Sequence, residues 1–172
     1  MKKFLLLLIV FFSFRFPKAQ QVIDLQENTP YEQKGLLYGY YITNETSKEV
    51  KGEDYDRFEL VMYVTNKSGA MKIIPFTISG SNVTDDEAVI ADFNCKNATG
   101  KRLTSKSAQV KVKPWMTQVK ITDEAHPAKY KIVNAQAGFA LLNNQTASTK
   151  IIVIVPKAQR PQVTCRPAYL PE

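Results

Sequence analysis

The chain has 172 residues, of which 44% are hydrophobic, and a formal net charge of +7. Four of its 23 basic residues lie in the first 18 positions, so residues 20–172 keep 23 − 4 = 19 basic and 16 acidic side chains, a net charge of +3. This excess is small, and no basic stripe with interleaved aromatic residues is present, so we expect no nucleic-acid partner. The length fits a single domain.

Residues 1–19 have the layout of a secretory signal peptide. Lys2 and Lys3 precede an apolar stretch that runs from Phe4 to Phe14, and a short polar segment follows it and ends at Ala19. The stretch is too short to span a bilayer, which requires roughly 20 apolar residues. We therefore expect cleavage after Ala19, no transmembrane segment in the remaining chain, and export to the periplasm, the cell surface or the medium.

The mature chain alternates apolar and polar residues with a period of two and is rich in β-branched and aromatic residues. Asn, Gly, Asp and Pro separate these segments, and none of the segments has a helical period. This pattern predicts an all-β fold for residues 20–172, namely an antiparallel β-sandwich, immunoglobulin-like or related. Its eight expected strands lie at residues 35–43, 57–65, 71–79, 88–94, 107–113, 117–122, 138–143 and 150–155.

Three of these segments allow finer predictions. Residues 150–155, KIIVIV, are almost continuously apolar, which predicts a central strand covered on both faces. Pro75 cannot donate to a strand ladder, so residues 71–79 should form an edge strand or carry a bulge. Residues 66–69, NKSG, have the chemistry of a hairpin connection between two strands.

The C-terminal tail, residues 156–172, contains four prolines and should not form regular structure over its length. Cys165 lies in this tail and Cys95 closes an expected strand. Two cysteines in an exported chain favour a disulfide, which would attach the tail to the edge of the sheet. A catalytic thiol served by His126 and a metal site are the competing interpretations of the pair.

Five Asn-X-Ser/Thr sequons occur in the mature chain. They would mark a glycosylated surface in a eukaryotic secretory pathway. Asn at the end of a strand, with Ser or Thr two residues later, is also ordinary turn chemistry, and we favour that interpretation. The sequons lie at Asn44, Asn66, Asn82, Asn97 and Asn144.

The segments MYVTNKSGAMKIIPF, ADFNCKNATGKRLT, VKPW and IVIVPKAQRPQVTCRPAYLPE are similar to uncharacterised secreted β-sandwich proteins of the Bacteroidetes type. The junction KAQQ also resembles the leader ends found in that group. The resemblance covers residues 57–172 and brings no catalytic motif. It implies an envelope or exported location and a disulfide-bearing β fold.

Motifs for catalysis are scarce. His126, the only histidine, lies in a polar connection, and an exposed loop residue is its simplest interpretation. The acidic clusters at residues 53–56 and 85–87 lack the spacing of a calcium-binding loop and read as solvated turns. The sequence contains no nucleophile elbow, no phosphate-binding glycine loop and no His-Glu-x-x-His motif. We predict a non-enzyme with no cofactor and no metal.

Two functions remain. The first is an exported, non-catalytic sandwich that binds a protein partner or forms part of an envelope assembly, with the edge strand around Met71, Ile73 and Pro75 as its contact surface. The alternative is a carbohydrate-binding module, assisted by calcium, on a ligand face formed by Trp115, Tyr38 and Tyr40. An exposed aromatic strip would favour the glycan, whereas a buried Trp115 with a bare strand edge would favour the protein partner.

Overall fold

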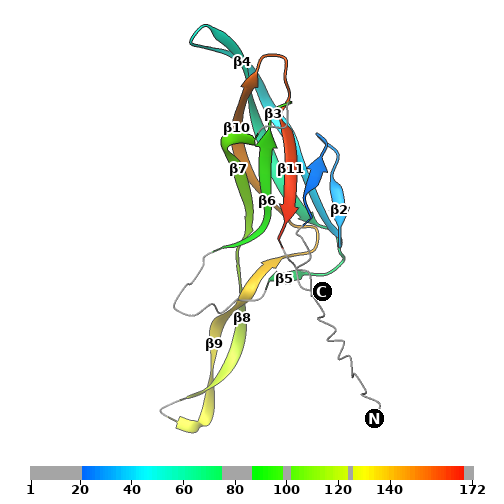
Figure 1. The fold of residues 1–172 in the computed structure, drawn as a ribbon. Coiled ribbons are helices and arrows are strands. Elements are labelled where there is room, and N and C mark those ends of the chain that lie inside the picture. The colour runs from blue at the N-terminus through cyan, green and yellow to red at the C-terminus, as the bar shows by residue number, and fades with distance from the viewer. Residues whose placement is uncertain (1–20, 75–86, 99–101, 124–125, 169–172) are drawn as a thin grey trace, which may run out of the picture.

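The structure, a computed structural model, is all-β, as predicted (Figure 1). It describes residues 21–74, 87–98, 102–123 and 126–168, so the predicted signal peptide lies outside the described residues. The strands are β1 (Ile23–Leu25), β2 (Tyr31–Gln33), β3 (Leu36–Val50), β4 (Glu53–Asn66), β5 (Lys72–Ile74), β6 (Ala88–Lys96), β7 (Arg102–Val112), β8 (Pro114–Asp123), β9 (His126–Leu141), β10 (Thr146–Pro156) and β11 (Gln162–Pro167).

These strands form three antiparallel sheets with the orders β1-β11-β6-β7, β10-β4-β3-β2 and β5-β9-β8. We call them sheets A, C and D. Alternate residues of sheets A and C point inward and share one core, so the two sheets form a sandwich; Phe93 and Val163 come from sheet A, and Phe58 and Met62 from sheet C. The sandwich class is confirmed, while the immunoglobulin-like subtype stays a prediction.

The C-terminal tail enters the middle of a sheet. β11 pairs with β1 on one side and with β6 on the other, with Cys165 opposite both Ile23 and Phe93. The prediction that the tail attaches to a sheet edge was therefore wrong. Prolines at positions 156, 161 and 167 lie at or just outside the ends of β10 and β11, where a missing N–H costs least, so the six residues between Pro161 and Ala168 can pair.

The apolar segment KIIVIV was predicted to be central, and this was wrong. It belongs to β10, which lies at the edge of sheet C beside β7 of sheet A. Val153 and Val155 are buried, whereas Ile152 and Ile154 point outward and are exposed. The strand therefore has one covered face. Because its exposed positions are isoleucines, the sequence shows no alternation of apolar and polar residues there.

The segment after β4 is a corner between two sheets, and the predicted hairpin does not form. β4 pairs with β3 and β10, whereas β5 pairs with β9 in sheet D. Gly69 has a φ of 79°, as a turn glycine is expected to have. The turn chemistry was thus predicted correctly, but it redirects the chain from sheet C to sheet D.

A fully buried side chain, Asn66, organises this corner. Its Nδ2 donates to the carbonyl oxygens of Ala70 at 2.7 Å and Leu141 at 2.8 Å. Its Oδ1 accepts from the N–H of Ser68 at 3.0 Å and from the Ser68 hydroxyl at 2.7 Å. Asn66 therefore joins the end of β4 to the end of β9, and its amide, although part of a sequon, has no exposed atoms for a glycan.

β5 is an edge strand of sheet D, in agreement with the prediction for residues 71–79, although residues 75–79 lie outside the described part of the chain. It passes very close to β9 at Gly138, which has a φ of 139°. A β-carbon at this glycine would lie 2.7 Å from the carbonyl oxygen of Ile74. Both the backbone angle and this approach require glycine there.

We predict that Asn66→Ala lowers the free energy of unfolding by about 3 kcal/mol, because the variant leaves buried backbone groups without partners. Urea unfolding measures this. Asn134→Ala is the matched control, since Asn134 is exposed on β9 and its loss should change stability by less than about 0.5 kcal/mol. A loss below about 1 kcal/mol for Asn66→Ala would show that the corner does not depend on this amide.

Candidate functional site

The predicted ligand face on β3 is not a surface. Tyr38 and Tyr40 are 2% and 5% exposed and belong to the core, so their assignment to a ligand face was wrong. Burial raises the pKa of both phenols above the ordinary value. The alternation of LYGYY was predicted to put at least one set of tyrosines in the core, and this was correct: Tyr41, on the other face, is exposed.

Two other aromatic features of the described surface bear on the predicted ligand face. Tyr41 and Tyr63 lie on the outer face of sheet C with ring centroids 6.0 Å apart and a tilt of 48°. Trp115 is half-buried at the base of β8, opposite Gly138 of β9. The tilted pair offers no flat platform, and Trp115 is neither fully covered nor part of an exposed strip, so its burial alone does not separate the two functions.

β8 and β9 form a long hairpin that projects away from the sandwich (Figure 1). The ladder runs from Pro114 opposite Phe139 to Asp123 opposite His126. Only the base of β9 contributes to the core, through Phe139 and Leu141. The sequence pattern predicted strands at the central residues of β8 and at the base of β9, but it did not predict that β8 and β9 form a projecting hairpin.

Large apolar side chains are exposed along this hairpin. Tyr130 and Ile132 on β9 are 64% and 58% exposed, and Met116 on β8 is 53% exposed. They share one face of the ribbon with Lys120, whose Nζ lies 4.5 Å from the centre of the Tyr130 ring. The other face carries half-buried Val119 opposite Val133 and exposed Ile121. The ribbon therefore exposes large apolar side chains on a two-stranded element that projects from the sandwich, which is unusual for a surface exposed only to water.

The predicted edge contact lies beside this hairpin, because β5 pairs with the base of β9. Met71 is half-buried just before the strand, and Ile73 is 42% exposed within it. Pro75 lies outside the described residues. The structure thus places Met71 and Ile73 at an edge of sheet D, and their role in contacting a partner stays a prediction.

Cys95 and Cys165 lie on neighbouring strands, and no disulfide joins them in the structure. Both are buried and face the core. Cys95 stands opposite Val163, and Cys165 stands opposite Phe93, so the two cysteines are diagonal neighbours, farther apart than a directly opposed pair. Strand pairing of β11 therefore holds the tail, which was the role predicted for the disulfide.

The Cys165 thiol is a poor nucleophile. Burial, followed by the negative charge of Asp92, raises its pKa to about 12. A reactive cysteine needs a thiolate at neutral pH, which requires a lowered pKa. Burial in the core therefore does not give Cys165 the lowered pKa that a catalytic thiol requires.

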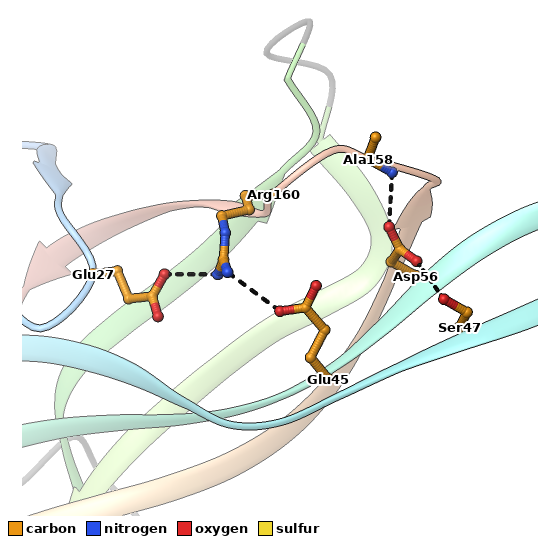
Figure 2. A network of polar contacts seen from close by, with 6 residues as sticks. All are labelled: Glu27, Glu45, Ser47, Asp56, Ala158 and Arg160. Carbon is orange, nitrogen blue, oxygen red and sulfur yellow. Dashed lines mark hydrogen bonds and ion pairs between the residues drawn. The ribbon is translucent and has the colours of Figure 1, made fainter.

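A polar network holds the crossover between β10 and β11 onto sheet C (Figure 2). The Asp56 carboxylate accepts from the N–H of Ala158 at 2.7 Å and from the Ser47 hydroxyl at 3.1 Å. Arg160 donates to Glu27 at 3.0 Å and to Glu45 at 3.2 Å. Arg160 is thus ion-paired with two glutamates, and Asp56 is held by two neutral donors, so the network positions the crossover.

The other predicted polar groups are dispersed. His126 begins β9 and is exposed, rather than lying in a loop. In the acidic cluster at residues 53–56, Asp54 pairs with Lys157 at 2.8 Å, while residues 85 and 86 are outside the described part. Within residues 21–74, 87–98, 102–123 and 126–168, no three His, Cys, Asp or Glu side chains are grouped as for a metal ion, and no helix could cross a membrane.

The outer face of sheet A carries a shallow polar hollow that the sequence did not reveal. Its volume is about 510 Å³. β6, β7 and β11 supply the polar side chains, and Val22, which precedes β1, is the apolar residue of the lining. The polar lining residues are Asp92, Asn94, Lys96, Ser107, Gln109, Thr164 and Arg166.

Comparison of the chain with protein-family models, with curated proteins and with solved structures gave no match.

We predict that Cys165 in the folded protein reacts with iodoacetamide at pH 8 at least about a hundredfold more slowly than in the urea-unfolded chain, because its pKa of about 12 suppresses the thiolate. Intact and peptide mass spectrometry measures the label. Rapid labelling of the folded protein would contradict the burial of this thiol. A chain two hydrogens lighter, unlabelled even in urea, would instead establish the disulfide predicted from the sequence.

Proposed function

We propose that the protein is an exported, non-catalytic β-sandwich that binds a protein partner in the periplasm or at the cell surface. The observation that carries the proposal is the projecting β8–β9 hairpin, whose outward side chains include Tyr130 at 64% and Ile132 at 58% exposure. Burial of such side chains gives roughly 25 cal/mol per Å² of apolar surface, which makes the ribbon a favourable docking element. The signal-peptide layout of residues 1–19 supports export.

Strand addition is the mode of binding that best fits the hairpin. β8 lies at the edge of sheet D among the described strands. The N–H of Ala140 donates to the carbonyl oxygen of Lys113 at 3.3 Å, so the backbone hydrogen-bonding groups of Lys113 point toward β9. Because backbone groups alternate sides along a strand, Pro114, Met116 and Gln118 direct theirs away from β9. Pro114 thus occupies the position where an edge strand tolerates proline, and the outward groups that follow are available to a partner strand.

The side chains complement this backbone edge. Met116, Tyr130 and Ile132 lie on one face. Met116 would be a direct neighbour of the added strand, and Tyr130 and Ile132, one strand farther away on β9, would contact partner side chains that extend across this face. Lys120 stands among them, directly opposite Ile132, with its Nζ over the ring of Tyr130 in a cation–π contact. A partner strand would therefore gain both main-chain hydrogen bonds and apolar contacts, which is the combination that strand addition uses.

We predict that the double variant Tyr130→Ser/Ile132→Ser loses its protein partner. Both side chains are exposed in the folded protein, so stability should change by less than about 1 kcal/mol while the docking surface is lost. The tagged full-length chain is produced with its own leader, crosslinked in cells and captured, and partners are identified by mass spectrometry. Recovery should fall at least about tenfold.

Ile154→Ser is the matched control, because Ile154 is 37% exposed on the outer face of sheet C, away from the hairpin. It should leave the recovery unchanged. Gln118→Pro tests the mode of binding, since it removes an N–H that faces away from β9 and should also abolish capture. The proposal fails if no stoichiometric partner is captured, or if the double variant captures as much partner as Ile154→Ser does.

A further inference from the structure

The polar hollow on sheet A is formed by residues that strand pairing brings into rows. Arg166 of β11, Asp92 of β6 and Gln109 of β7 stand opposite one another in one row. Thr164, Asn94 and Ser107 form the next row, and Lys96 stands in the row beyond. The inward neighbours of these residues, such as Phe93 and Val163, fill the core, so the rows are fixed by buried strands.

These side chains have unused hydrogen-bonding capacity. Among the described residues, the only side-chain hydrogen bond in the hollow runs from the Thr164 hydroxyl to the backbone oxygen of Asn94, at 3.4 Å. Asp92 and Arg166 are direct cross-strand neighbours of opposite charge, yet no ion pair joins them. By contrast, Asp56 and Arg160 each make two hydrogen bonds within the protein, so the hollow is the surface better suited to an external ligand.

The chemistry of the lining defines the ligand class. The amides of Asn94 and Gln109 and the hydroxyl of Ser107 both donate and accept, which matches sugar hydroxyl groups. Lys96 and Arg166 provide two positive charges against the single negative charge of Asp92, which favours an anionic ligand. Val22 is the only apolar residue of the lining, so an apolar ligand or a hydrophobic peptide side chain finds little surface there.

The distance between the two cations of the hollow indicates a ligand made of several sugar units. Residues on one face of a strand follow each other at about 6.6 Å, so the rows of Arg166 and Lys96 lie about 13 Å apart along the strands. A single sugar cannot contact both cations, whereas a short chain lying across the open hollow can. A nucleic acid is disfavoured because the Asp92 carboxylate, between Arg166 and Gln109, would repel its phosphates. The lining also contains no aromatic residue on which bases could stack.

We propose that the outer face of sheet A binds an acidic oligosaccharide, with its carboxylates on Lys96 and Arg166 and its hydroxyls on Asp92, Asn94, Ser107 and Gln109. This site differs from the predicted aromatic face and needs no calcium. It is also independent of the proposed protein partner, because it lies on sheet A and the hairpin belongs to sheet D.

The test is titration of the full mature chain with a galacturonic acid tetramer, followed by calorimetry and by NMR shifts of backbone amides, with neutral maltotetraose as the matched ligand. We expect the acidic tetramer to bind and to shift amides of β6, β7 and β11. Lys96→Gln and Arg166→Gln should each weaken binding about tenfold, since each removes a charge-assisted hydrogen bond. Added salt should weaken binding further.

Lys150→Gln is the control, because Lys150 is an exposed lysine on β10 of the opposite sheet. It should leave the affinity for the tetramer unchanged, as should Tyr130→Ser/Ile132→Ser in the hairpin. The proposal is overturned if the acidic tetramer causes no shifts at millimolar concentration, if maltotetraose binds as tightly, or if Lys96→Gln and Arg166→Gln bind as well as Lys150→Gln. Each variant must show the urea midpoint of the parent chain to within about 0.3 M.

Discussion

The pairing of β11 between β1 and β6 is the constraint on which sheet A depends. β1 has no other strand partner among the described residues, so the N-terminal strand joins the sheet only through the C-terminal one. β11 also places Val163 and Cys165 in the core, where both are essentially unexposed. Because this contact joins the two ends of the domain, its loop-closure entropy is large and it should form late in folding.

Strands with a clean alternation could be predicted from the sequence. The segments at 57–65 and 88–94 correspond closely to the buried centres of β4 and β6, where inward Phe58, Leu60 and Phe93 recur at every second position. The all-β class followed from the same pattern. Strand ends were underestimated: β3 continues beyond Ile42 as a polar ladder, and β9 extends into the projecting hairpin, where its side chains do not alternate between a core and solvent.

Other features depend on tertiary context that one sequence does not contain. The prolines of the tail concealed β11, although the six residues from Gln162 to Pro167 suffice for a strand that is paired on both sides. Asn66 resembled an ordinary turn residue, and only its burial against Leu141 and Ala70 shows that it joins two sheets. Tyr38 and Tyr40, which were predicted to form a ligand face, point into the core with Leu36 of the same strand. The sequence alternation alone does not show which face of β3 is inward.

The two surfaces depend on different parts of the fold. In the hollow, residues from three separate segments meet only because of strand register, with Arg166 opposite Asp92 and Asp92 opposite Gln109. The outward residues of β11 line the hollow while its inward residues fill the core, so any change that displaces β11 removes the hollow and destabilises the sandwich together. The hairpin is held by its own ladder and by the base of β9, so its apolar surface can vary without cost to the core. A fold that places its polar rows on a buried strand and its apolar contacts on a projecting ribbon therefore keeps the two surfaces physically separable.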